Sequence, residues 1–163
     1  MAGHLATALL ADLRPADRAE VETLTGGTAQ DFLPLYLNAL LAQEGRGSHA
    51  YALFSAAHTL AGVCGVAVDP EQADAGLIWM VGTREIDRRP LEFLRASRAW
   101  MAGEGRSHEP GWARLHNIVD ARNTRHMDWL CWLGFEIDPE PQPHGADGLP
   151  FHGFHKDLDR GTS

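Results

Sequence analysis

The sequence predicts an α/β domain with a mixed central sheet and helices on its flanks. Three patterns predict it: apolar residues at helical spacing in the N-terminal quarter, short apolar runs of strand length after residue 48, and a strand–helix–strand unit in the middle of the chain. A length of 163 residues is sufficient for one domain with its own hydrophobic core. We therefore expect residues 1–163 to form a single domain.

The N-terminal quarter predicts three helices. The first is indicated by apolar residues around Leu9, and the second covers residues 16–24 and ends before two glycines. Thr28 followed by Asp31 resembles a capping box, which predicts the start of the third helix. We expect this helix despite Pro34 in its first turns. Its apolar face contains Phe32, Leu35, Tyr36, Leu40 and Leu41.

The middle of the chain changes to the pattern of a sheet. Two short apolar runs predict an antiparallel pair of strands, at residues 49–57 and 60–68. Leu77 to Val81 is continuously apolar, which is typical of a strand buried on both faces. Pro90 then opens a helix, and a strand over 115–119 follows the loop at 103–111. A strand, a helix and a second strand form a right-handed crossover, so we expect the strands at 77–81 and 115–119 to be parallel.

The C-terminal part predicts one more helix and two strands. The helix covers residues 124–133, with Asn123 as its N-cap and Gly134 as the residue that ends it. The segment 138–150, DPEPQPHGADGLP, contains too much proline and glycine for regular structure. The terminal strands are expected on either side of it, at 135–137 and 151–156.

Composition and charge exclude several classes of protein. The formal net charge of −8 argues against a duplex-DNA binder, which needs a basic face. No run approaches the length of a membrane span, and the N-terminus lacks the basic residues of a secretory signal, so we expect synthesis in a cytoplasm. Cys64 and Cys131 lie in apolar segments and are interpreted as small buried hydrophobes.

Histidines and tryptophans give weaker hypotheses. His152 and His155 would point to opposite faces of a strand, so we expect no metal site. For His126, at a helix start, a hydrogen-bonded surface position is favoured over a contact with a ligand. Three tryptophans are assigned to the core or its edge: Trp79, Trp129 and Trp132. Two others, Trp100 and Trp112, lie where an exposed aromatic residue suits a protein interface.

A polar group follows the predicted strand at 115–119. Asp120, Arg122 and Asn123 lie where α/β folds place ligands, at the carboxyl end of a parallel strand. Capping of the next helix and an ion pair of Arg122 with an acid account for the same residues. We favour this second interpretation.

The segment N-T-R-H-M-D-W-L-C-W-L-G-F, residues 123–135, is similar to the pattern N-x-x-A-x-x-L-Y-x-x-L-G-F of the GNAT N-acetyltransferases. The resemblance implies a mixed sheet whose parallel central strands splay apart around acetyl-CoA. Leu130 holds the place of the tyrosine that protonates the leaving thiolate in catalytic members. The family's R/Q-x-x-G-x-G/A loop corresponds to GTREIDRRPLEF, which has Gly82 and no later glycine.

A second resemblance covers nearly the whole chain. The strings LRPADRAEVETLTG, IWMVGT, FLRASRAW, HNIVDARNTRHMDWLCWLGF and GLPFHGF are similar to a family of short-tailed phages, called internal virion protein A or phage GNAT-like proteins. It implies a virion structural or assembly protein, made in the host bacterial cytoplasm. Its expected partners are other virion proteins (portal, tail or internal components), in several copies set by the symmetry of the particle.

Two functions follow from these resemblances. The first is a virion protein on a GNAT scaffold without catalysis, without a cofactor and without catalytic or metal-binding residues. The second is an active acetyl-CoA-dependent N-acetyltransferase, and a host-directed effector remains a further alternative. Only under the second would a cofactor bind, and the residues expected to hold it are Arg84, Arg88, Arg89 and Asn123.

Overall fold

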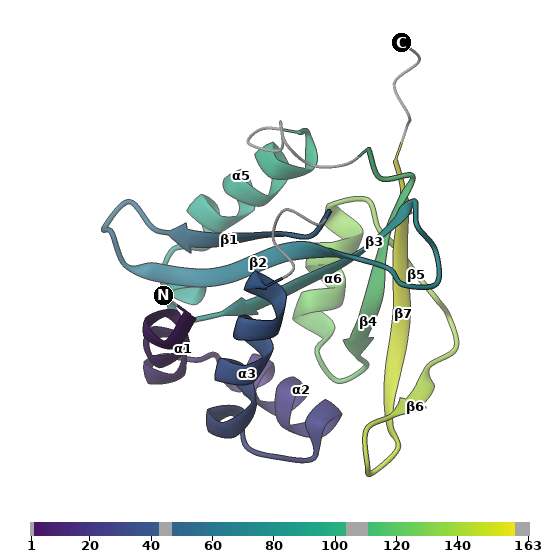
Figure 1. Ribbon diagram of the computed structural model, residues 1–163. Helices are drawn as coiled ribbons and strands as arrows, with labels where there is room; N and C mark the ends of the chain where they lie inside the picture. Colours follow the sequence, from purple (N-terminus) through teal and green to yellow (C-terminus); the bar gives the residue numbers. More distant parts are fainter. Residues whose placement is uncertain (1, 43–46, 104–110, 159–163) are drawn as a thin grey trace.

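A computed structural model gives the protein over residues 2–42, 47–103 and 111–158 (Figure 1). The loop expected at 103–111 therefore lies mostly outside the described residues. Three helices open the chain, as the sequence predicts: α1 (Ala2–Ala11), α2 (Pro15–Thr25) and α3 (Ala29–Leu41). The side chain of Thr28 accepts a hydrogen bond from the backbone N–H of Asp31, so the predicted cap of α3 is confirmed.

A seven-stranded mixed sheet forms the centre of the molecule, in the order β1-β2-β3-β4-β7-β5 with β6 paired to β7. All neighbouring strands are antiparallel except β3 and β4, which are parallel. The strands are β1 (His49–Phe54), β2 (Leu60–Val68), β3 (Ala75–Gly82), β4 (Arg114–Asp120), β5 (Glu136–Ile137), β6 (Gln142–His144) and β7 (Leu149–Asp157). The predicted antiparallel pair and the predicted parallel crossover are both confirmed.

The parallel strands β3 and β4 stay together over a short distance only. Their ladder joins three residue pairs and ends at Leu77 and His116. At the next position Asn117 donates its side-chain N–H to the carbonyl of Ile78 at 2.7 Å. A side chain thus replaces the next backbone bond, and beyond it the two strands diverge into a splay that opens toward their carboxyl ends.

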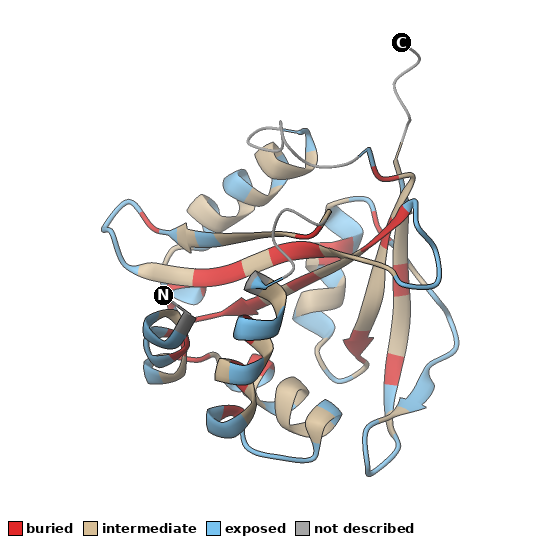
Figure 2. Ribbon diagram, viewed as in Figure 1, coloured by how far each residue is buried: buried red, intermediate tan, exposed pale blue. Residues whose placement is uncertain are grey.

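Helices cover both faces of the sheet. On one face lie α5 (Pro90–Met101) and α6 (Thr124–Trp132), whose residues pack on a cluster around Val66, Leu115 and Val119. On the other face α1 and α3 pack against Val63 and Trp79. Figure 2 shows the buried residues concentrated along β2, β3 and β4 between these two layers. The splay therefore opens between two layers of helices.

The helix α6 begins and ends as the sequence predicts. Asn123 caps its first turn by accepting a hydrogen bond from the backbone N–H of His126, and Gly134 follows it with a φ of 87°. Phe135 then turns into the core and packs edge-on against Phe154. Leu130, in the place of the family's tyrosine, is 2% exposed and packs in the same core.

The segment 138–150 is more regular than predicted, because it contains β6. Pro143 pairs with Pro150 at the edge of the sheet, where a missing N–H is tolerated. Gly145 and Gly148 have φ values of 73° and 59° and form the turn to β7. A Cβ atom on Gly145 would lie 2.2 Å from the carbonyl oxygen of Thr23, so this turn packs directly against α2.

Three further expectations about burial are wrong. Cys131 is exposed, whereas the sequence places it among the buried hydrophobes. Trp112 is 4% exposed and belongs to the core, although it follows a loop. Trp132, expected in the core or at its edge, is 43% exposed and lies under the guanidinium group of Arg98, 4.1 Å from its ring centroid.

Candidate functional site

Two cavities meet where β3 and β4 splay apart. The first, which we call the splay cavity, has a volume of about 520 Å³ and is lined mostly by apolar side chains. Its lining includes Ile78 and Met80, which point to the α5–α6 face, and also Trp79 and Val81, which point to the α1–α3 face. The splay cavity therefore passes through the sheet from one layer of helices to the other.

The second cavity, which we call the mouth cavity, has a volume of about 500 Å³. It lies among the N-terminal ends of α2, α5 and α6, and four residues line both cavities: Met80, Phe93, His126 and Trp129. Along a strand the backbone groups of alternate residues face the same neighbour, so the N–H and C=O of Met80 face the same edge as the Ile78 carbonyl. This edge of β3 lies beyond the end of its ladder with β4 and can pair with an extended ligand.

The helix α2 spans the open end of the splay. The carboxyl group of Asp17 lies next to the backbone amide of Gly82, the last residue of β3. That of Glu20 lies next to the backbone amide of Asp120, the last residue of β4. Arg14 binds Asp17 at 2.5 Å, whereas Glu20 faces the splay cavity. One turn of α2 thus places two acids at the ends of two strands.

The carboxyl group of Glu20 has a raised pKa. Burial raises the pKa of its carboxyl group to about 8, and the negative charges of Asp17 and Asp120 add to this effect. Asp120 itself stays ionised, because the side chain of Arg122 and its backbone N–H lower the pKa of that carboxyl. The predicted ion pair of Arg122 with an acid is therefore present, as Arg122 binds Asp120 at 2.5 Å.

Two polar atoms at the start of α6 are buried and lack a hydrogen-bond partner among the described residues: the amide Nδ2 of Asn123 and the ring Nδ1 of His126. Asn123 lines the mouth cavity, and His126 lines both cavities. The preferred surface position of His126 is wrong, because its ring is partly buried and packs on Trp129. Burial lowers the pKa of His126 to about 4, and the positive charge of Arg14 contributes. The ring is therefore neutral at pH 7.

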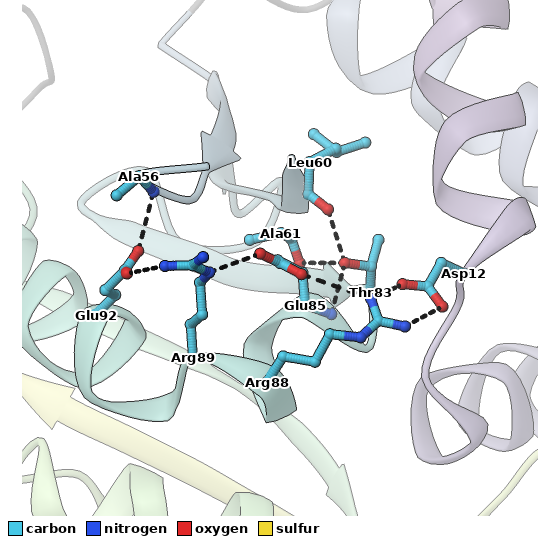
Figure 3. A network of polar contacts seen from close by, with 9 residues as sticks. All are labelled: Asp12, Ala56, Leu60, Ala61, Thr83, Glu85, Arg88, Arg89 and Glu92. Carbon is cyan, nitrogen blue, oxygen red and sulfur yellow. Dashed lines mark hydrogen bonds and ion pairs between the residues drawn. The ribbon is translucent and has the colours of Figure 1, made fainter. Parts of the chain in front are cut away.

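The segment that follows β3 has the opposite character, because most of its charged groups are paired (Figure 3). We call residues 83–92 the seam. Arg88 binds Asp12 at 2.6 Å, and Arg89 binds Glu85 at 3.1 Å and Glu92 at 2.7 Å. Glu92 also accepts a hydrogen bond from the backbone N–H of Ala56. Glu85 is 5% exposed, so the network has a buried anchor.

Most backbone amides of the seam are used as well. Every backbone N–H from Thr83 to Arg89 has an acceptor inside the protein, and Pro90 has none to offer. The acceptors are oxygen atoms of Asp12, Ala61, Thr83, Arg84 and Glu85. The short helix α4 (Glu85–Arg88) occupies the stretch where an anion-binding loop would present free amides.

The predicted cofactor-binding residues thus separate into two groups. Arg88 and Arg89 are ion-paired in the seam, and Arg84 begins α4 with an exposed side chain. Asn123 lies apart from them, at the mouth cavity. The sequence interpretation missed Glu20 and Asn117, for which the only signals were an acid one turn after Asp17 and a polar residue inside a strand. No three His, Cys, Asp or Glu side chains gather as metal ligands within the described ranges.

The chain was compared with family models, curated proteins and solved structures. No family model matches the chain, and no curated protein matches it. Among solved structures it is similar to RimL, a ribosomal L7/L12 alpha-N-protein acetyltransferase in complex with coenzyme A, with a TM-score of 0.70 and 14% identity over 97% of this chain and 89% of that one. The chain has the GNAT fold.

Two more GNAT structures share this architecture. A GCN5-related N-acetyltransferase from Kribbella flavida has a TM-score of 0.64 and 19% identity, over 94% of this chain and 92% of that one. A ribosomal-protein-S5-alanine acetyltransferase from Vibrio fischeri has a TM-score of 0.67 and 12% identity, over 99% of this chain and 90% of that one. Identities this low establish the fold and leave the activity open. None of the described helices is long and apolar enough to cross a membrane.

The GNAT fold implies coenzyme A, and the two parts of this molecule fit the protein differently. The pantetheine arm fits: the free edge at Met80 and the unpartnered amide of Asn123 can bond its amide groups, and the splay cavity can enclose its thioester end. The diphosphate fits less well, since Arg88, Arg89 and the backbone amides of residues 83–89 already have partners inside the protein, and Arg84 is the arginine of the seam with an exposed side chain and no ion pair among the described residues.

Proposed function

We propose that this protein transfers an acyl group from a pantetheine thioester to a primary amine. The observation that carries the proposal is the splay cavity, whose lining extends from Met80, at the free edge of β3, to Glu20 on α2. A bound acyl thioester would supply an activated carbonyl carbon. An acceptor amine that enters the splay cavity would meet the carboxyl group of Glu20 in its wall.

Glu20 takes the role of general base in this proposal. The reaction replaces a C–S bond with a C–N bond, and the amine gives up a proton that Glu20 can accept. A pKa of about 8 matches the task better than an ordinary carboxylate, because the proton affinity of the base is closer to that of an amine. Leu130 has no proton to donate, so the leaving thiolate takes a proton from water to become the free thiol.

The test has two steps, binding and turnover. Calorimetric titration with S-acetylpantetheine and with acetyl-CoA measures thioester binding. Release of free thiol is then followed with a library of peptides that have free α-amino groups or lysines, and the products are identified by mass spectrometry. We expect saturable binding and thiol release that depends on the peptide. An absence of heat with both thioesters, together with no acetylated peptide, would contradict the proposal.

A role as a virion-associated protein of a short-tailed bacteriophage is the second candidate. It is favoured by Leu130, which has replaced the tyrosine of the GNAT pattern, and by the paired charges of the seam. Under this proposal the scaffold docks to other virion proteins, such as portal, tail or internal components. Mass spectrometry of purified particles and deletion of the gene test it. Particles that lack the protein and assemble and infect normally after deletion would rule it out.

A further inference from the structure

Resting on the proposed acyl transfer, we infer that the acyl donor is a phosphopantetheine thioester carried by an acidic protein, which docks on the outer face of α5. The diphosphate of coenzyme A does not match the groups that the seam offers. A nucleotide diphosphate needs free backbone amides and cations. Every N–H from Thr83 to Arg89 is bonded internally, and the carboxylates of Glu85 and Glu92 hold Arg89. A donor without that diphosphate avoids the conflict.

The arm of such a donor still has a complete path. It can enter at the mouth cavity, pass the unpartnered Nδ2 of Asn123, pair with the edge of β3 at Met80 and reach the splay cavity. Phosphopantetheine has one phosphate in place of the diphosphate and nucleotide of coenzyme A. That phosphate would lie outside the mouth cavity, whose charged lining pairs Arg125 with Asp87 at 3.0 Å.

The outer face of α5 has the properties that an acidic partner needs. Leu91, Arg95 and Arg98 are spaced by four and three residues and all are exposed, with Leu91 at 65%. Arg98 stacks on the exposed ring of Trp132 in α6, which holds its guanidinium group in place. The inner face of the same helix lines the mouth cavity through Phe93 and Leu94. The docking face and the entrance for the arm thus belong to one helix.

Residues 84–98, which include the outer face of α5, have a net positive charge although the chain as a whole is negative. Residues 84–98 contain five arginines and three acidic residues, a net charge of +2, while the whole chain has −8. A basic face on an acidic protein attracts an acidic partner by steering and repels most acidic competitors elsewhere on its surface. Leu91 and Trp132 add apolar area to this face, which a protein partner can bury and a free small molecule cannot.

The experiment compares three donors on the full chain: S-acetylpantetheine, acetyl-CoA, and bacterial acyl carrier protein loaded with acetyl-phosphopantetheine. We expect acetyl-CoA to bind within about threefold of S-acetylpantetheine, because the backbone amides of residues 83–89 and the side chains of Arg88 and Arg89 are already bonded within the protein. The loaded carrier protein should bind at least about tenfold more tightly than S-acetylpantetheine, with an affinity that falls as salt is added.

Charge reversal locates the docking face. The double variant Arg95→Glu, Arg98→Glu should lose the gain from the carrier protein, about tenfold or more, and leave the affinity for S-acetylpantetheine unchanged. Arg18→Glu, on α2, is the matched control and should bind the carrier as the original chain does.

The affinities of the three donors decide between the inference and the proposed function. Acetyl-CoA binding more than about tenfold tighter than S-acetylpantetheine would overturn the inference and leave the proposed acyl transfer standing. A carrier protein that binds equally well without its arm, or no better than the arm alone, would also overturn it. Failure of all three donors to bind would instead contradict the proposed function itself.

Discussion

The seam and the start of α6 lie on either side of the mouth cavity, and they treat their polar groups in opposite ways. In the seam, the ion-paired arginines and the amides of residues 83–89 are bonded within the chain. At the start of α6, Asn123 and His126 each bury a nitrogen that has no hydrogen-bond partner in the part of the chain that the structure describes. A buried polar group without a partner costs free energy, so it marks a place where a ligand repays that cost. Arginines in a row, by contrast, can be purely structural.

The largest effect of a substitution is expected at Glu20 on α2, which lines the splay cavity. The variant Glu20→Gln keeps the shape of the side chain and removes its ability to accept a proton. The rate of acyl transfer should fall about 100- to 1000-fold, as for loss of a general base. In the original chain the rate should rise with pH up to an apparent pKa near 8, and this rise should vanish in the variant. Glu140→Gln, at an exposed position, serves as control.

A stability effect is expected when the seam is disturbed. Glu85→Gln weakens ion pairs of a buried carboxylate with Arg88 and Arg89, and should lower the free energy of unfolding by about 2 kcal/mol. Urea denaturation measures it, with the exposed Glu71→Gln as control. The affinity for S-acetylpantetheine should not change. A loss of thioester affinity without a loss of stability would make the seam part of the binding site and remove the contrast.

His126, at the start of α6, makes the stability of the protein depend on pH. Its folded-state pKa of about 4 lies below the ordinary value of 6.5, so its contribution to stability is present above pH 6.5 and is lost as the pH falls toward 4. Since the ring is only partly buried, the loss should be about 2 kcal/mol, less than the full shift is worth. His126→Gln should remove this part of the acid destabilisation. Parallel pH–stability curves for the two proteins would show that the ring is not protected from protonation.

The smallest expected effect separates the two roles of Asn123. Asn123→Asp keeps the oxygen that caps α6 and removes the unpartnered Nδ2 donor. Stability should stay within about 0.5 kcal/mol, because Asn and Asp are equally good caps. The affinity for S-acetylpantetheine should fall about five- to tenfold, the value of one hydrogen bond. Equal affinity of both proteins would mean that this nitrogen does not contact the arm.

The sequence predicts the elements of this fold well, because their signals are local. Three features can be recognised from a few neighbouring residues: the cap at Thr28, the left-handed turn at Gly134 and the apolar run of β3. The strand β6 was missed because edge pairing of prolines has no local signature.

The candidate site was far less predictable, because it depends on contacts between distant segments. Nothing in the segment around Glu20 shows that it will reach the end of β4, and nothing around Arg88 shows that Asp12 will neutralise it. Asn117 looks like an ordinary polar residue of a strand until its contact with Ile78 is known. Asn123 was identified in advance, because its capping role and its place in the GNAT pattern both depend on neighbouring residues.

The contact between Gly145 and Thr23 has a consequence for local unfolding. Thr23 lies one turn after Glu20 on α2, so the β6–β7 turn supports the same stretch of helix that closes the splay. Segments packed in this way open together as one cooperative unit, however far apart they are in the chain. Amide hydrogens of the β6–β7 turn and of α2 should therefore exchange at a common rate, and a ligand in the splay cavity should slow both.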